Sequence, residues 1–263
     1  MVSVFEALGI FLAGLAAGTI NTVVGSGTLI TFPTLLFFGY PPLTANISNN
    51  IGLVGGGVTG SWGYRHELGG AGPAIRRLVP MSLAGGITGA VLLRVLPASA
   101  FAAIVPVLIA IGVLLVVLGP AIQRRAAARR EGEDEVHPVH RGGATTVLLM
   151  AAVFVAGVYG GYFGAAQGVI LMGVLSVLSS EPLQRLNGYK NVLALVVNTV
   201  AALVFVVVAH ELIDWLVVLL IAVGSLLGGV VGSTVGRRLP PVVLRGFIVV
   251  IGVVGIIKIV WFS

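Results

Sequence analysis

The sequence is marked first by what it lacks. No cysteine occurs among its 263 residues, which excludes disulfides, thiolate metal sites and chemistry that relays sulfur through a thiol. Charged residues make up only 9% of the chain, whereas soluble domains carry about 25%. The most loop-like run, NTVVGSGTLITFP (21–33), contains neither Gly-x-Gly-x-x-Gly nor the Lys-Ser/Thr pair of a phosphate-binding loop. We therefore predict no nucleotide site there.

Long apolar runs take the place of charge. Apolar residues make up 57% of the chain, and runs such as 100–119 and 203–210 offer no polar face to water. Because a helix needs about 20 apolar residues to cross the hydrocarbon core, we predict an all-α, polytopic membrane protein. The N-terminus carries Glu6 and no basic n-region, so it is predicted to be a first membrane segment rather than a cleaved signal peptide.

An internal repeat organises the chain. Five short patterns recur in the same order at offsets of 139 to 144 residues, as expected of a duplicated unit. We therefore predict two related halves, residues 1–122 and 143–263. The paired ranges are 18–28 with 157–167, 46–51 with 187–192, 66–68 with 210–212, 85–89 with 228–232, and 94–97 with 237–240.

Residues 123–142 join the two halves. They include five arginines, four acidic residues and a proline without an apolar period, which predicts a solvent-exposed, poorly ordered linker. Each half is predicted to contain five helical segments. These are 4–24, 27–39, 43–64, 74–95 and 98–121 in the first half, and 143–163, 166–179, 188–209, 213–235 and 241–261 in the second.

The second segment of each half is unusually short. It has 13 or 14 residues, about 20 Å as a helix, against a hydrocarbon core of about 30 Å. It is either a short span or one arm of a re-entrant hairpin that turns at Gly25, Ser26 and Gly27. Either way each half crosses the membrane an odd number of times, so the second half is inverted relative to the first.

The basic residues support this inverted topology. Under it, thirteen of the fifteen lysines and arginines fall on one side, and only Arg94 and Lys258 fall on the other. Parallel halves would split them almost evenly. The positive-inside rule therefore predicts a cytoplasmic linker and outside termini in the inner (cytoplasmic) membrane. The thirteen are Arg65, Arg76, Arg77, Arg124, Arg125, Arg129, Arg130, Arg141, Arg185, Lys190, Arg237, Arg238 and Arg245. This placement also explains the net charge of +6 without a nucleic-acid partner.

Glycine-interrupted segments at matching positions of inverted repeats point to the midplane site of a transporter. The two places are 21–33 and 159–169, with breaks at Gly25, Gly27 and Gly164. The helix starts near both breaks would direct partial positive charge inward. The alternative is that these small residues serve helix packing alone. Neutral hydrogen-bonding groups at the two breaks are Asn21, Ser26, Thr28, Tyr159, Tyr162 and Gln167.

The third segment of each half carries a second polar cluster. Such groups are costly in lipid unless they face a cavity or each other. Lys190 is the one cation that would lie well inside a span, and the alternative for it is snorkelling to the headgroups. The cluster comprises Asn46, Ser48, Asn49 and Asn50 in the first half, and Asn187, Tyr189, Lys190 and Asn191 in the second, with Asn198 further along the same helix.

Acidic residues and histidines are absent from the middle of the predicted helices. His66 and His210 lie at segment ends, and neither is followed by the second histidine of a His-Glu-x-x-His metal site. This disfavours a transition-metal cation permease, a carboxylate proton relay and a membrane-embedded enzyme. We predict no enzyme activity, no metal and no cofactor, and a neutral site with one lysine favours an anion. A non-transporting membrane assembly protein stays open as an alternative.

At these residues the chain resembles the sulfite exporter TauE/SafE family over nearly its whole length. The matching features are the paired glycine-rich openings, the Pro-Leu starts at 42–50 and 182–191, and the Gly-Gly-x-x-Gly helices. The resemblance implies secondary transport, usually outward, of small organosulfur oxyanions such as sulfite, sulfoacetate or related sulfonates. The second half replaces Asn21 by Gly160 and Asn49 by Lys190, so the two half-sites are expected to contribute unequally.

We therefore predict an inverted-repeat transporter that works by alternating access on a small anion in the lipid bilayer. A homodimer is compatible with its glycine-rich faces. The predicted substrate-binding residues are Asn21, Ser26, Thr28, Asn46, Asn49, Asn50, Tyr162, Gln167, Asn187, Tyr189, Lys190 and Asn191.

Overall fold

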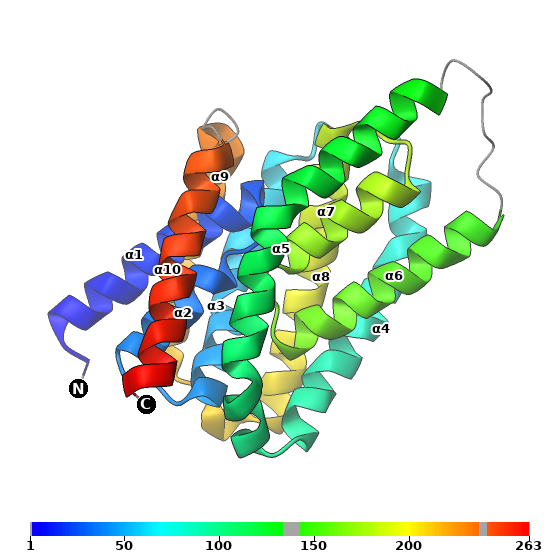
Figure 1. Ribbon diagram of the computed structural model, residues 1–263. Coiled ribbons are helices and arrows are strands. Elements are labelled where there is room, and N and C mark those ends of the chain that lie inside the picture. The colour runs from blue at the N-terminus through cyan, green and yellow to red at the C-terminus, as the bar shows by residue number, and fades with distance from the viewer. Residues whose placement is uncertain (1, 134–142, 237–240, 263) are drawn as a thin grey trace.

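A computed structural model describes residues 2–133, 143–236 and 241–262. Over these residues the secondary structure is helical, with connecting turns and loops and no strand (Figure 1). The first half contains α1 (Val4–Val23), α2 (Thr28–Phe37), α3 (Pro42–Gly63), α4 (Gly72–Val95) and α5 (Ala98–Glu133). The second contains α6 (Gly143–Tyr162), α7 (Gln167–Leu178), α8 (Leu183–Val208), the 3-10 turn η1 (His210–Leu212), α9 (Trp215–Thr234) and α10 (Pro241–Phe262).

All ten predicted segments are helices, and the all-α membrane class is confirmed. Six helices are long and apolar enough to cross a membrane, namely α1, α4, α5, α6, α8 and α9. The shorter α2 and α7 have 10 and 12 residues, so they are about 15 and 18 Å long. The chain is therefore a multi-pass membrane protein whose second and seventh helices are too short to span unaided.

Two predicted boundaries were wrong. Helix α5 continues to Glu133, whereas we expected it to end at 121, so the first part of the expected linker is helical. Its alanine, arginine, glutamine and glutamate residues are strong helix formers, which explains the extension. The rest of the expected linker, 134–142, lies outside the described residues. Helix α8 begins at Leu183, five residues earlier than predicted, directly after Pro182.

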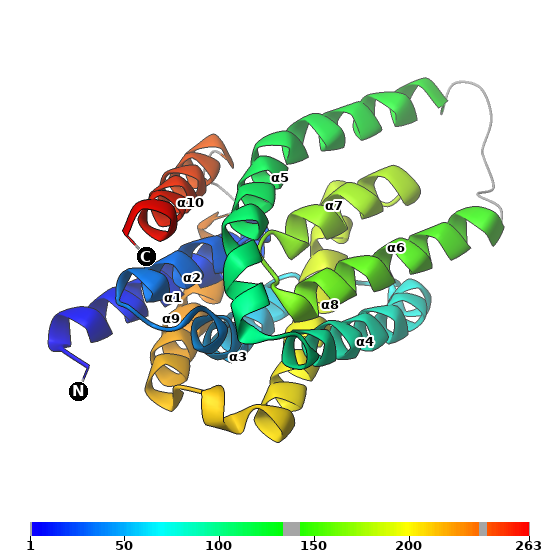
Figure 2. The same cartoon turned by 60° about the horizontal axis from the view of Figure 1, so that its bottom comes forward.

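The helices pair across the two halves. Helix α1 packs against α9, and α6 packs against α4; likewise α2 contacts α10, and α7 contacts α5. Helices α3 and α8 contact each other and also pack on α9 and α4, respectively. Figure 2 places α1 and α9 on one side and α4 and α6 on the other, with α3 and α8 between them.

Helix directions differ between the halves. The colour gradient in Figure 1 shows that α3 and α8 run in opposite directions, as do α5 and α10. The ends of α1, α3 and α5 and the starts of α8 and α10 therefore lie towards one end of the bundle, which we call the linker side. The starts of α3 and α5 and the ends of α8 and α10 lie at the other.

Glycines allow the pairs across the halves to pack backbone to backbone. A Cβ atom at Gly89 of α4 would lie 2.1 Å from the carbonyl oxygen of Val158 in α6. One at Gly228 of α9 would lie 2.1 Å from the carbonyl oxygen of Leu15 in α1. The two repeated Gly-Gly-x-x-Gly patterns thus serve the same kind of crossing in each half, as small residues do in membrane bundles.

We expect Gly228→Ala to lower the free energy of unfolding by about 1–3 kcal/mol, because the new methyl group would displace α1. Gly246→Ala is the matched control, since nothing lies within 4 Å of a Cβ there and alanine favours the helix. The measurement is the melting temperature of both variants in detergent. Equal melting temperatures would contradict the close crossing of α1 and α9.

Candidate functional site

The two helix breaks meet inside the protein. The first joins α1 to α2 through Gly25, whose φ is 90°, and the second joins α6 to α7 through Gly164, whose φ is 78°. Both values lie in the left-handed region that glycine adopts without penalty. The backbone N–H of Gly168 donates a hydrogen bond of 2.9 Å to the carbonyl oxygen of Gly25. Backbone of one half is thus bonded directly to backbone of the other.

This contact between the breaks is close on both sides. A Cβ atom at Gly25 would lie 2.5 Å from the Cα of Gly168, and one at Gly168 would lie 2.4 Å from the Cα of Gly25. The N–H groups of Gln167 and Val169 also donate to carbonyl oxygens, those of Gly164 and Ala166. The first amides of α7 are therefore all engaged with backbone carbonyl oxygens.

Lys190 is the buried cation of the site. Its side chain is 1% exposed, and Nζ donates to the carbonyl oxygens of Thr22 at 2.9 Å and Asn21 at 3.3 Å. Asn191 Nδ2 donates to the same Thr22 oxygen at 3.3 Å. These carbonyls form the C-terminal end of α1, where the helix dipole is negative. Lys190 thus caps the first break from α8 and does not snorkel to the membrane surface.

Asparagines of α3 hold the neighbouring helix ends. Asn49 Oδ1 accepts a hydrogen bond from the Thr31 hydroxyl, and its Nδ2 donates to Thr28 Oγ1 at 3.3 Å. Asn46 Nδ2 donates to the carbonyl oxygen of Tyr162, the last residue of α6, at 3.0 Å. Helix α3 therefore caps the end of α6, just as α8 caps the end of α1.

The two breaks differ in how they are braced. Asn21 Oδ1 accepts from the N–H of Gly27 at 3.4 Å. Its counterpart in the repeat is Gly160, where a Cβ atom would lie 2.3 Å from Cδ of Gln167. The buried Gln167 side chain therefore occupies the space that an asparagine would need. The second break is instead braced by Tyr159, whose hydroxyl donates to the carbonyl oxygen of Ala165 at 2.6 Å.

This cluster contains buried side-chain atoms that could form further hydrogen bonds. Seven of the predicted site residues carry a buried polar atom that has no hydrogen-bond partner among the described residues, and five of the seven belong to this cluster. A buried polar atom without a partner costs about 1–3 kcal/mol, so groups of this kind are retained where a ligand or water can use them. The five atoms of the cluster are Ser26 Oγ, Asn46 Oδ1, Asn50 Oδ1, Tyr162 Oη and Gln167 Nε2.

Two predicted residues lie apart from this cluster. Asn187 is half-buried and lines a separate cavity on the linker side. Tyr189 is buried in an apolar cluster with Leu186 and Leu193 of its own helix.

Two other residues of the cluster were missed from the sequence, Thr22 and Thr31. A local signal was available for both, because Thr22 directly follows Asn21 and Thr31 lies one turn after Thr28. Within the ranges that the structure describes, no three histidine, aspartate or glutamate side chains gather as metal ligands.

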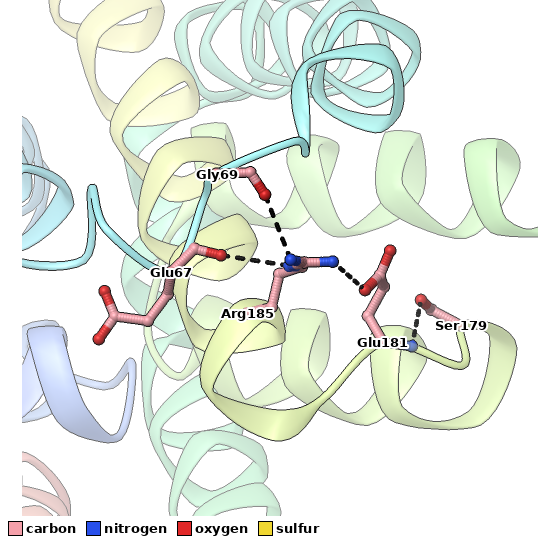
Figure 3. Close-up of polar contacts among 5 residues, drawn as sticks. All are labelled: Glu67, Gly69, Ser179, Glu181 and Arg185. Carbon is pink, nitrogen blue, oxygen red and sulfur yellow. Dashed lines mark hydrogen bonds and ion pairs between the residues drawn. The ribbon is translucent and has the colours of Figure 1, made fainter.

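Arginines hold the loops that follow α3 and α8. Arg185, at the start of α8, donates to the carbonyl oxygens of Glu67 and Gly69, both at 3.2 Å, and pairs with Glu181 at 2.8 Å (Figure 3).

At the other end, Arg94 Nε donates to the carbonyl oxygen of Val208 at 3.0 Å, and its guanidinium lies 3.5 Å from Glu211. The C-terminal ends of α3 and α8 are thus each tied by an arginine.

The model of the family described as sulfite exporter TauE/SafE matches residues 10–259. The chain belongs to this family. It is also similar to curated membrane proteins. It is 27% identical over 249 residues to "Probable membrane transporter protein ORF9" of Sinorhizobium sp, covering 93% of this chain and 88% of that protein. No solved structure matches it.

Two further relatives agree with this assignment. "Probable membrane transporter protein YfcA" of Escherichia coli (strain K12) is 23% identical over 256 residues, or 97% of this chain and 89% of that protein. A "Probable membrane transporter protein" of Haemophilus influenzae is 26% identical over 245 residues, or 90% of each chain. This TauE/SafE protein is therefore a membrane transporter.

We expect Gly25→Ala to break the contact between the two helix breaks. The new methyl group would overlap Gly168, and alanine would also be strained at this positive φ. Gly39→Ala is the matched control, since Gly39 has the same φ of 90° with nothing within 4 Å of a Cβ. The measurements are melting temperature and transport. Gly25→Ala should lower both well below the control, and equal behaviour of the two variants would refute a close contact between the breaks.

Proposed function

We propose that this TauE/SafE protein exports small organosulfur oxyanions, such as sulfite, sulfoacetate or related sulfonates, across the cytoplasmic membrane by alternating access. The observation that carries the proposal is the polar cluster around the contact between the breaks. It combines leftover hydrogen-bonding atoms with one buried lysine and contains no acidic side chain. The name of the family, sulfite exporter, supplies the class of anion.

The distribution of charge supports an anion over a cation. Four acidic residues make polar contacts at helix ends or in loops, and none of the four lies in the middle of a helix. They are Glu6, Glu181, Glu211 and Asp214. An ionisable group inside the membrane usually marks the pathway of its substrate, and here that group is a lysine. We propose no catalytic step, because no nucleophile and base face each other in the cluster.

Inverted repeats are the architecture that we propose for this site. Each helix pair across the halves has a counterpart, α1–α9 with α6–α4 and α2–α10 with α7–α5. The opposite directions of α3 and α8, and of α5 and α10, also support it. With the positive-inside rule, this arrangement predicts outside termini and a cytoplasmic linker in the inner membrane.

In the proposed transport cycle, the contact between Gly25 and Gly168 is the place where the substrate path is closed. Its separation would free the N–H of Gly168 in the first turn of α7, a donor of the kind that helix N-termini offer to anions. Ser26, Gln167 and the charge of Lys190 would surround the same point. Export of an anion from a negative-inside cell gains about 2.3 kcal/mol per charge per 100 mV, so no coupling ion is needed.

The topology can be tested with reporter fusions at residue 132 and at the C-terminus. We expect the two reporters to lie on opposite sides of the membrane, with residue 132 inside, because five helical segments separate them with odd parity. Fusions to phosphatase and to a fluorescent protein at both positions measure this directly. Reporters on the same side would rule out inverted halves.

The substrate class can be tested by counterflow in proteoliposomes with labelled sulfite, sulfoacetate, sulfate, acetate and Ni²⁺. We expect saturable exchange of a sulfur oxyanion that Lys190→Ala and Lys190→Gln both abolish. Glutamine keeps a donor for the α1 carbonyls, so its effect reports the charge. Arg77→Ala, which removes an exposed cation, is the control and should exchange normally.

Each other outcome of that assay has a definite meaning. Exchange of Ni²⁺ alone would support the alternative of a transition-metal permease. Undiminished sulfur-oxyanion exchange in Lys190→Gln would show that the lysine charge is not used. No exchange of any anion by a monodisperse protein would refute the proposed substrate class.

A further inference from the structure

A cavity of about 180 Å³ opens on the linker side of the bundle, among α1, α5, α7, α8 and α10. Its inner wall includes Val24 of the first break and Val169 in the first turn of α7. Because a water molecule occupies about 30 Å³ in the liquid, the cavity has room for about six waters or one compact organic anion. It therefore reaches from the linker side to the contact between the breaks.

Arg245 brings to this cavity a cation that has no ion-pair partner among the described residues. It lies in the first two turns of α10, is half-buried and lines the cavity wall. The ion pairs among the described residues involve other cations, and Arg124 is near enough to act on Arg245 as a like charge. A partly buried cation without an acidic partner is costly, and a bound anion would remove that cost.

Amide side chains complete the polar wall. Gln123 of α5, Gln184 of α8 and Asn187 of α8 line the cavity with Arg245. Asn187 Oδ1 is a buried acceptor that has no hydrogen-bond partner among the described residues, so water in the cavity can satisfy it while the Nδ2 donors of the same amide serve an anion. Side-chain amides offer N–H donors, and a guanidinium matches the paired oxygens of a sulfonate or similar group.

We propose that this cavity is an anion-collecting vestibule, in which Arg245 and the three amides bind a compact oxyanion before it reaches the breaks. The identity of that anion as an organosulfur compound rests on the proposed function. The selection of negatively charged ligands by the cavity does not depend on the proposed function. A lipid phosphate shares this chemistry, so the experiment must separate a free anion from a headgroup.

The cysteine-free chain makes a charge-sensitive test possible. Gln184→Cys, in phosphatidylcholine nanodiscs, is labelled with the anionic sulfonatoethyl and the cationic trimethylammonioethyl methanethiosulfonates. We expect Arg245→Gln to lower the ratio of anionic to cationic rates about tenfold, since a cationic cleft concentrates anions at least that much. Arg245→Lys should retain most of the ratio.

Ala144→Cys, an exposed position at the start of α6, is the control, and its rate ratio should not respond to Arg245→Gln. If Arg245→Gln changed the rate ratio equally at both cysteines, the change would reflect the overall electrostatic potential of the protein surface. That result would overturn the proposal. So would a ratio at Gln184→Cys that does not change when Arg245 is replaced.

The occupant is identified by protection of Gln184→Cys from labelling. Sulfoacetate should slow labelling in phosphatidylcholine discs and lose this effect in Arg245→Gln. Protection by phosphatidylglycerol discs without protection by sulfoacetate would assign the cavity to a lipid headgroup and overturn the vestibule.

A transport arm separates this inference from the proposed function. In proteoliposomes, Arg245→Gln should raise the KM for sulfur-oxyanion uptake from the linker side about tenfold, with kcat retained. Unchanged KM with normal wild-type transport would overturn the vestibule alone. Wild-type protein that labels as expected but moves no sulfur anion would overturn only the proposed function.

Discussion

The backbone hydrogen bond between Gly168 and Gly25 is the constraint on which the rest of this transporter depends. It requires two irregular segments to approach within van der Waals contact inside the protein, where free backbone groups are costly. Glycine at both positions makes the approach possible. The helices that end and begin at these segments then need caps, and the surrounding asparagines, threonines and Lys190 provide them.

The caps on the C-terminal ends of α1 and α6 link the two halves to each other. Lys190 and Asn191 of α8 hold the end of α1, and Asn46 of α3 holds the end of α6. Glycine-lined crossings of α1 with α9 and α4 with α6 add close packing between the same halves. In the proposed cycle, separation of the breaks would therefore require relative movement of the two halves.

Much of this arrangement could be predicted from the sequence, because apolar runs and glycine breaks are local signals. Eight of the ten helices begin and end within two residues of their predicted limits. The charged extension of α5 was missed because its helix-forming residues lack an apolar period. The pairing of Gly25 with Gly168, the carbonyl partners of Lys190 and the cavity beside Arg245 required the fold, since they join residues more than a hundred positions apart.

The chemical difference between Asn49 and Lys190 has an energetic consequence. Two identical halves would give inward-facing and outward-facing forms of equal free energy, related by exchange of their roles. Here only the first break is capped by an ammonium group, whereas the corresponding position of the other half holds a neutral amide. In the proposed alternating-access cycle, the two forms would therefore differ in free energy before any substrate binds, and the empty protein would have a preferred resting side.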